Sequence, residues 1–180
     1  MNTGEAVVRS DTTMVSVRRY RPSDYRPAAR LFRELSRTHR DFYLMKRGPD
    51  PDPDRWFHRH LKKHGPKNLY VAEERGRVVG IVGLIPHRNF GEVEPLVVAS
   101  ARRRRGIAGT LIQTVTQEAK RRRWKTLVVE VVARNPVALR TFHALGFRTL
   151  VNLDLQMGLN GPGWFVPRPG PRIASRRFQS

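Results

Sequence analysis

A run of arginines and small residues, Arg103 to Gly109, separates a strand-like apolar segment from a helix-like one. At the first turn of a helix the backbone N–H groups have no partner within the helix and carry a partial positive charge. A pyrophosphate can approach those groups when no large side chain blocks it, and Gly106, Ala108 and Gly109 meet that demand. The alternative interpretation is that an arginine run beside a glycine is only a solvated turn.

Several other chemistries have no support in the sequence. The chain has no cysteine, which excludes a thiolate nucleophile, a Cys-ligated zinc and a disulfide framework. GxGxxG, GxxxxGK[ST] and GxSxG motifs are missing. His60 and His64 are i, i+4 neighbours with His58 close by, but no acidic residue completes a metal site there. We therefore expect surface histidines on a basic helix and no metal.

The composition bounds the architecture and the partners. With 180 residues, 39% of them hydrophobic, the chain is long enough for one well-buried core and short for two. The formal net charge of +20 favours anionic partners or cofactors, while arginines spread from Arg9 to Arg177 also fit a compositional habit of the host. Signal-peptide and membrane-span patterns are missing, so we expect a soluble, cytoplasmic protein with no membrane association.

The elements that must position these residues follow from the hydrophobic spacing. Residues 1–13 predict a disordered tail. The N-terminal half then predicts a strand from Val15 to Tyr20, helices at Tyr25–Thr38 and Asp54–His64, strands at Leu69–Glu73 and Arg77–Ile85 joined by a hairpin turn at Glu74–Gly76, and a strand at Glu92–Val98.

The C-terminal half alternates helices and strands. An apolar stripe of period 3.6 predicts a helix from Ile107 to about Arg121. The nearly continuous apolar run Thr126–Val132 predicts a strand covered on both faces and central in its sheet. Asn135 and Pro136 begin a helix that Gly146 ends, and alternation predicts a last strand from Phe147 to Met157. We expect one domain over residues 14–159 and an irregular basic tail over 160–180.

Two motifs in register resemble the GNAT N-acetyltransferase superfamily. The phosphate loop of that family, [RQ]-x-x-G-x-[GA], is matched by Arg103, Gly106 and Ala108. The family's N-x-x-A and G-F pieces are matched by Asn135 to Ala138 and by Gly146-Phe147. The order of elements from Val15 to Met157 also fits. The resemblance implies an α/β fold with a mixed, mostly antiparallel, splayed sheet of about six strands flanked by about four helices.

The resemblance also implies an acetyl-CoA site and a reaction, the transfer of an acetyl group to a primary amine. Backbone groups of Leu96, Val97 and Val98 would bond to pantetheine, and Asn135 and Phe142 would face the cofactor. In this family the strands that hold Val98 and Thr126–Val132 splay apart around the acyl thioester. The pyrophosphate would lie on Arg103, Arg104, Arg105, Gly106, Ile107, Ala108 and Gly109.

An ammonium acceptor must lose a proton before it attacks, so a carboxylate at the open end of the splay is the expected base. Strand alternation predicts that Glu92 and Glu94 share a face with Leu96 and Val98. Glu94 matches the base position of many family members, and Glu130 that of the protein N-terminal branch. Glu94 is the first candidate, then Glu130, with Glu92 a third. For each the alternative is a salt bridge to one of the many arginines.

The family's usual acid for the departing thiolate is a tyrosine, and Phe142 stands at its position. Protonation is then left to water, His143 or Tyr70, or activity is weak or lost; we expect a working enzyme with a relaxed need for the acid.

A positive field disfavours cationic small acceptors and favours a protein N-terminus or lysine on an acidic or nucleic-acid-bound partner, such as a ribosomal component. The alternative is a catalytically weak basic module of the same fold that binds nucleic acid or an acidic partner. Arg102–Arg105, Arg121–Arg123 and the tail would grip the nucleic acid. Either protein could be a monomer or a homodimer.

Overall fold

The computed structural model describes residues 7–8, 15–43, 52 and 54–152. The chain divides into two compact units, residues 1–35 with 51–130 and residues 36–50 with 131–180, and each is described by itself. The elements in chain order are β1 (Val7–Val8), β2 (Val15–Arg19), α1 (Tyr25–Tyr43), α2 (Arg55–His64), β3 (Leu69–Glu74), β4 (Arg77–Pro86), β5 (Phe90–Val98), α3 (Ile107–Arg121), β6 (Thr126–Val128) and α4 (Pro136–Ala144).

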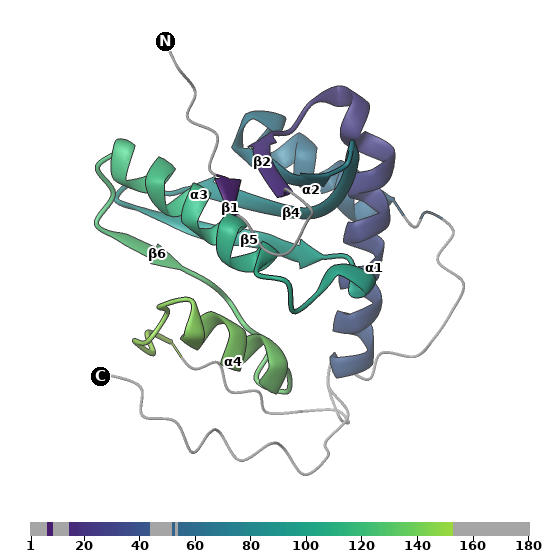
Figure 1. The fold of residues 1–180 in the computed structure, drawn as a ribbon. Helices are drawn as coiled ribbons and strands as arrows, with labels where there is room; N and C mark the ends of the chain where they lie inside the picture. Colours follow the sequence, from purple (N-terminus) through teal and green to yellow (C-terminus); the bar gives the residue numbers. More distant parts are fainter. Residues whose placement is uncertain (1–6, 9–14, 44–51, 53, 153–180) are drawn as a thin grey trace. The chain divides into compact units, whose positions relative to one another are not determined.

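The strands form one six-stranded sheet in the order of the chain, β1-β2-β3-β4-β5-β6 (Figure 1). Every neighbouring pair is antiparallel except β5 and β6, which are parallel. The predicted α/β class, with a mostly antiparallel sheet of about six strands and about four helices, is confirmed. The hairpin turn is also confirmed, because Arg75 and Gly76 take φ values of 50° and 73° between β3 and β4.

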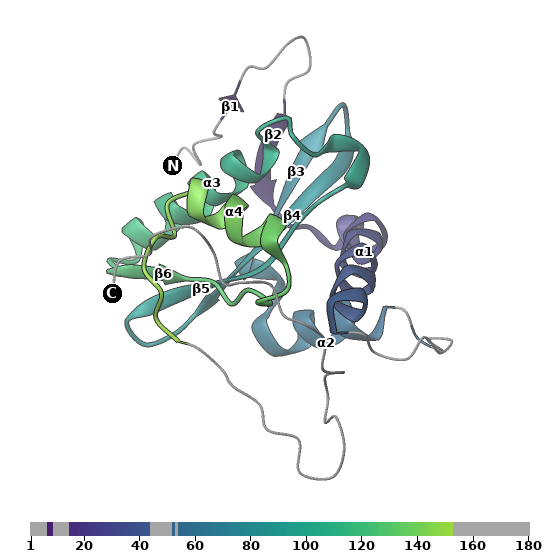
Figure 2. The same ribbon diagram turned by 90° about the horizontal axis from the view of Figure 1, so that it is seen from below.

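Helices cover both faces of this sheet (Figure 2). On one face, Ala28 and Phe32 of α1 and Phe57 of α2 form a buried cluster with Leu69, Val71, Ile81 and Val97 of the strands. On the other face lies α3, since a Cβ added to Gly80 would come within 3.1 Å of Leu111 Cδ1. The helix predicted from Ile107 to Arg121 has those bounds in the structure, and Leu111, Val115 and Ala119 of its apolar stripe are buried.

Three sequence-based expectations differ from the structure. The predicted central strand Thr126–Val132 ends at Val128, and among the described residues β6 lies at one end of the sheet. Its apolar residues Leu127 and Val128 are therefore only half-buried. Val7 and Val8 of the expected tail pair with β2. Of the predicted strand Phe147–Met157, Thr149 forms a single bridge, and the part after Asn152 lies outside the described residues, as does the tail 160–180.

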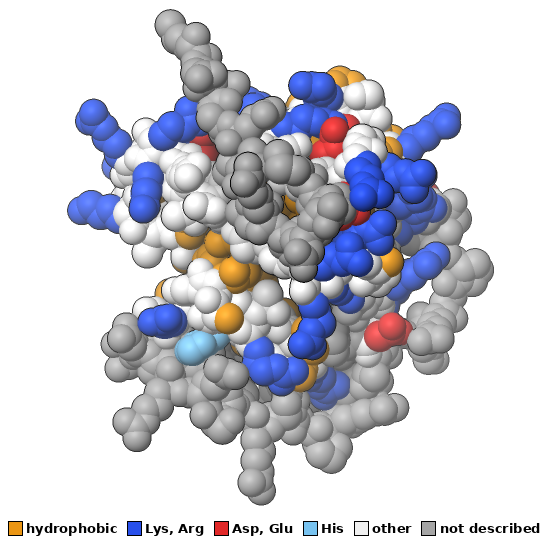
Figure 3. All heavy atoms as spheres, in the orientation of Figure 1, with side chains coloured by type: hydrophobic (Ala, Val, Ile, Leu, Met, Phe, Trp, Pro, Cys, Tyr) orange, Lys and Arg blue, Asp and Glu red, His pale blue; other side chains and the backbone are white. Residues whose placement is uncertain are grey.

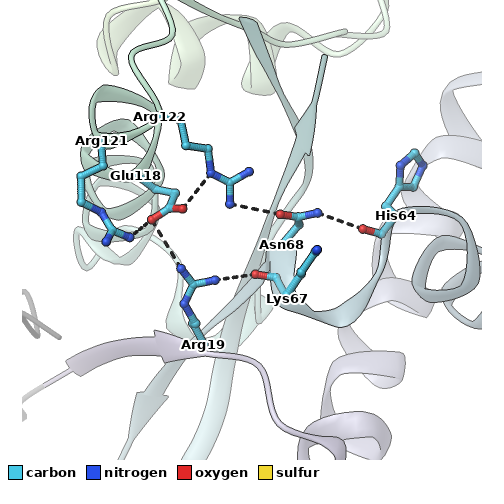
Figure 4. A network of polar contacts seen from close by, with 7 residues as sticks. All are labelled: Arg19, His64, Lys67, Asn68, Glu118, Arg121 and Arg122. Atoms are coloured by element: carbon cyan, nitrogen blue, oxygen red, sulfur yellow. Dashed lines mark hydrogen bonds and ion pairs between the residues drawn. The ribbon is translucent and has the colours of Figure 1, made fainter. Parts of the chain in front are cut away.

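Glu118, near the end of α3, is the centre of a network of arginines that joins this helix to other segments. Its buried carboxylate accepts hydrogen bonds from Arg121 and, at 2.8 Å, from Nε of Arg122, and it lies 3.5 Å from Nη2 of Arg19 (Figure 4). Arg122 also donates to Oδ1 of Asn68, and Arg19 donates to the carbonyl of Lys67 at 2.7 Å. A buried carboxylate is costly unless it is paired, so these arginines are what permits its burial. The end of α3 is thereby tied to β2 and to the segment that follows α2.

No helix in the described part of the chain is long and apolar enough to cross a membrane.

His60 is a core residue, and the expectation that α2 carries only surface histidines is wrong for it. Its side chain is 8% exposed and packs against the rings of Phe32, at 5.7 Å, and His64, at 4.9 Å. Burial lowers the pKa of His60 to about 4, and the charges of His64 and Lys63 add to the effect. His60 is therefore neutral in the folded protein at neutral pH. No group of three or more possible metal ligands occurs among the described residues.

Because the pKa of His60 is lower in the folded than in the unfolded chain, His60 should make stability depend on pH. Its contribution is complete above the unfolded value of 6.5 and is lost as the pH falls toward 4, by about 3 kcal/mol in all. We expect His60→Gln to flatten the stability curve between these two values, measured by urea unfolding across the range. The exposed neighbour on the same helix provides the control, and His58→Gln should leave the curve unchanged. An unaltered slope in His60→Gln would contradict the assignment.

Candidate active site

The site begins where the parallel pairing of β5 and β6 stops. Phe90, Gly91 and Glu92 pair with Thr126, Leu127 and Val128, and no later residues of the two segments are paired. β5 nevertheless continues to Val98, so its backbone from Val93 onward has no neighbour from β6. Continuing the register past its last pair places Glu94 opposite Glu130. The structure therefore brings together two of the predicted carboxylates at the end of the paired region.

An irregularity in β5 decides which way these carboxylates face. Val82 pairs with Leu96 but Leu84 pairs with Val93, so Glu94 and Pro95 together lie opposite Gly83. A Cβ on Gly83 would collide with the carbonyl oxygen of Glu94, which shows how closely the two strands approach there. One extra residue on one strand is the signature of a β-bulge.

The bulge overturns the expectation that four residues of β5 share one face. Leu96 and Val98 pair with Val82 and Gly80 on the α3 side of the sheet. Glu92 instead pairs with Ile85, which lies on the opposite face from Val82 because the two are an odd number of residues apart. At the end of α2, the negative charge of Glu92 acts to raise the pKa of His64. The positive charge of Lys63 in turn acts to lower the pKa of Glu94. The carboxylates therefore face the α2 side.

Glu94 has the electrostatics of a proton acceptor. Partial burial raises its pKa, and the negative charges of Glu92 and Glu130 raise it further, while the positive charge of Lys63 lowers it. Glu92 is committed elsewhere, because its Oε2 lies 2.8 Å from Nε2 of His87. Within the described part of the chain, neither Glu94 nor Glu130 has a hydrogen-bond or ion-pair partner. Among the described residues, therefore, no arginine forms the alternative salt bridge with either of these two.

The arginine and glycine run forms a loop whose backbone opens onto the first turn of α3. Gly106 is the N-cap of α3 with φ 78°, and no side chain caps the helix. The first bond of the helix runs from the N–H of Thr110 to the carbonyl of Gly106, so the N–H groups of residues 107 to 109 have no partner within the helix. Arg104 also takes a positive φ, 64°, which is unusual for a residue with a side chain. Such uncapped N–H groups suit an anion.

Ion pairs with distant parts of the chain hold this loop in place. Arg102 Nε donates to the buried carboxylate of Glu74 at 2.6 Å. Arg103 donates to Glu34 of α1 at 2.5 Å and to the carbonyl of Val98 at 3.0 Å. Arg103 is thus used to fix the loop to the end of β5, and Arg104 is exposed with no ion-pair partner among the described residues. The guanidinium of Arg104 is therefore available to an anion beside the uncapped turn.

Asn135 and Phe142, predicted to face the cofactor, belong to the second unit. Oδ1 of Asn135 accepts a hydrogen bond from the N–H of Ala138 at 2.9 Å, which confirms Asn135 as the cap of α4. Phe142 packs edge-on against Phe147 at 5.5 Å. Their roles toward a cofactor stay predictions. Of the other acids considered, Tyr70 has a buried hydroxyl without a partner in the described region, with Arg19 over its ring.

Sequence reasoning missed the residues that act on this site from far along the chain. Glu34 and Glu74 anchor the loop, Gly83 makes room for the bulge, and Lys63 modulates Glu94. No spacing pattern links any of them to the loop or to β5. Their roles depend on which elements pack together, and only the tertiary structure shows that.

Comparison with known proteins finds matches over much of the described part of the chain. Residues 29–147 match the Acetyltransferase (GNAT) family. A relative from Mus musculus, named probable N-acetyltransferase family 8 member 5, is 34% identical over 95 residues, which are 49% of this chain and 41% of that protein. The chain therefore spans less than half the length of this relative.

Two solved structures share the fold. The PaiA N-acetyltransferase from Thermoplasma acidophilum, in complex with coenzyme A, gives a TM-score of 0.61 at 16% identity over 76% of this chain and 91% of that one. The N-acetylglutamate synthase from Neisseria gonorrhoeae, complexed with coenzyme A and N-acetyl-glutamate, gives 0.55 at 18% identity over 71% of this chain but only 27% of that one.

The charges around Glu94 predict pKa changes of opposite sign in two variants. We expect Glu130→Gln to lower the pKa of Glu94, because it removes a negative neighbour, and Lys63→Gln to raise it, because it removes a positive one. Carbon-detected NMR titration of labelled glutamates, with Glu94→Gln to assign the signal, measures both. Lys120→Gln, an exposed lysine on α3, is the control and should cause no shift. Shifts of equal sign in the two variants would refute the arrangement.

Proposed function

Because this chain belongs to the acetyltransferase (GNAT) family, we propose that it transfers the acetyl group of acetyl-CoA to a primary amine by direct attack of the amine on the thioester. The observation that carries the proposal is the pairing of two features in one unit. An uncapped helix N-terminus follows β5, and a carboxylate without a partner among the described residues lies on β5 itself. The first suits a pyrophosphate and the second suits a proton acceptor.

The residues of the loop fit acetyl-CoA as the donor. Gly106 is exposed, and Ala108 and Gly109 bring no bulk to the first turn of α3, so a pyrophosphate can reach its N–H groups. Arg104 and Arg105 are exposed and supply positive charge beside that turn. Backbone groups of Leu96 and Val97 at the unpaired edge of β5 would bond to the pantetheine arm. When bound, acetyl-CoA supplies the thioester carbonyl that the amine attacks.

Glu94 is the proposed base. An amine arrives protonated at neutral pH, and it becomes a nucleophile only when a group within reach removes the proton. A raised pKa makes Glu94 a better acceptor than an ordinary surface glutamate, and Glu94 is free of competing ion pairs among the described residues. Glu130, opposite Glu94 in the continued register, is the second candidate. Glu92 is the weakest, because His87 already holds it.

The departing thiolate needs a proton, and Phe142 cannot give one. We propose that water supplies it, with His143 or Tyr70 as alternatives. The hydroxyl of Tyr70 is buried and has no hydrogen-bond partner among the described residues. A protein that binds the donor but turns over weakly is the remaining alternative.

The acceptor we propose is a protein N-terminus or a lysine on an acidic or nucleic-acid-bound partner. Lys and Arg side chains are spread over the face drawn in Figure 3, with few Asp or Glu among them. Together with the net charge of +20, this field repels a polyamine at long range and attracts a polyanionic carrier. The carboxylates on β5 then need only to remove the proton from the amine of the bound partner.

A negative charge in the first turn of α3 should separate donor binding from folding. We expect Ala108→Asp to weaken coenzyme A binding about tenfold relative to Ala108→Asn, because like charges about 4 Å apart repel by about 1 to 4 kcal/mol. The same aspartate should leave helix stability equal or higher, since an acid is favourable at a helix N-terminus. Isothermal titration with coenzyme A and thermal unfolding measure the two effects. Equal affinities in both variants would mean that the pyrophosphate binds elsewhere.

Glu94→Gln tests the base directly. With a thiol-release assay on acetyl-CoA and peptide acceptors, we expect kcat/KM to fall about 10²-fold while coenzyme A affinity is retained. The acidic limb of the wild-type pH profile should lie above the range of an ordinary glutamate, because the pKa of Glu94 is raised, and it should vanish in the variant. Glu92→Gln is the matched control and should cost far less. Near wild-type turnover in Glu94→Gln would assign the base to another group.

A further inference from the structure

Helix α2 presents a strongly cationic outer face. Phe57 and His60 are buried, whereas six residues on the other side are exposed: Arg55, Trp56, His58, Arg59, Lys62 and Lys63. At 100° per residue these six fall within one arc of the helix, which we call the basic α2 face. From Arg55 to Ala72 the sequence contains no acidic residue. The positive charges of this face are therefore not balanced within their own segment.

Trp56 stands out on this face because a large aromatic side chain is rarely left in solvent. It is 45% exposed, whereas the neighbouring Phe57 is fully buried. The guanidiniums of Arg59 and Arg55 lie 4.8 and 5.6 Å from the centre of its ring. An exposed ring beside two arginines offers stacking and cationic contacts at the same place.

The cationic surface continues past the end of α2. Lys67 is exposed, and its carbonyl accepts a hydrogen bond from Arg19 at 2.7 Å. Asn68 donates to the carbonyl of His64 and accepts from Arg122, which ties the end of α2 to the end of α3 (Figure 4). The side chains of Arg19 and Arg121 are 47% and 69% exposed, and Glu118 is the single carboxylate that they share with Arg122. The cations thus extend beyond the reach of a single phosphate.

From this we infer that the basic α2 face, continued through Lys67 to Arg19 and Arg121, binds single-stranded nucleic acid. A row of cations suits a chain of phosphates, and an exposed tryptophan suits an unpaired base. An acidic peptide would pair with the cations but has no base to stack on Trp56. In a duplex the bases are paired and stacked with one another, so they cannot stack on the ring. The inference concerns binding alone and does not depend on acetyl transfer.

The place of this surface links it to the proposed reaction. Lys63, on the same side of α2 as Trp56 and Arg59, lowers the pKa of Glu94 through its charge. A strand bound along the basic α2 face therefore lies on a helix whose Lys63 acts on the candidate base through its charge. If the proposed function holds, a protein carried on that nucleic acid is brought to the acceptor end of the site.

Two pairs of arginines with the same spacing provide the test. Arg55 and Arg59 are i, i+4 neighbours on α2, and Arg26 and Arg30 are exposed i, i+4 neighbours on α1. We expect the double variant Arg55→Gln, Arg59→Gln to weaken binding of a fluorescein-labelled oligouridylate at least about tenfold. Its slope of log Kd against log salt should fall by about 1.4, or about 0.7 for each lost phosphate contact. Arg26→Gln with Arg30→Gln removes the same charge and should change affinity by no more than about twofold.

Trp56→Ala separates stacking from charge. We expect it to weaken oligouridylate binding at least about fivefold while the salt slope stays unchanged, because no phosphate contact is lost. Circular dichroism and coenzyme A titration on each variant confirm that the fold and the donor site are intact. Three results would overturn the inference: equal losses in the two arginine pairs, wild-type affinity in Trp56→Ala, or stronger binding of the corresponding duplex or of polyglutamate. If the protein binds oligouridylate as expected but transfers no acetyl group, the result counts against the proposed function and not against this inference.

Discussion

The site depends on the close approach of two strands at Gly83. Only a residue without a side chain lets the backbone of β5 lie so near β4, and there β5 carries one more residue than its partner. The extra residue reverses the alternation, so Glu92 and Glu94 face the α2 side while Leu96 and Val98 face α3. One strand can then offer carboxylates to one side of the sheet and backbone groups at its unpaired edge.

Charge is organised locally within a molecule that is positive as a whole. Arginines near the site are largely committed: Arg102 to Glu74, Arg103 to Glu34, and Arg122 to Glu118. This leaves Arg104 exposed beside the uncapped turn of α3 and leaves Glu94 without a competing partner among the described residues. The ion pairs therefore shape the loop and clear the site, in addition to whatever stability they contribute. Exposed pairs contribute little stability, so positioning is their clearer role.

Helix α2 shows how packing divides one segment between two tasks. Phe57 and His60 enter the core against Phe32, and the burial of His60 suppresses its charge. On the opposite side the arginines and lysines stay in water around Trp56. At the end of the helix, the charges of Lys63 and His64 interact with the carboxylates of β5. A single helix thus joins the core, the candidate base and the basic α2 face.

Local patterns alone determined the hairpin at Arg75-Gly76, the bounds of α3, the cap at Asn135 and the small residues of the arginine and glycine run, because turn geometry, helical period and capping depend on residues close in sequence. Tertiary structure decided the rest. The face of Glu94 depends on a bulge opposite Gly83, the edge position of β6 on which strands it meets, and the burial of His60 on α1. These outcomes follow from contacts between segments far apart in the chain, which no local period encodes.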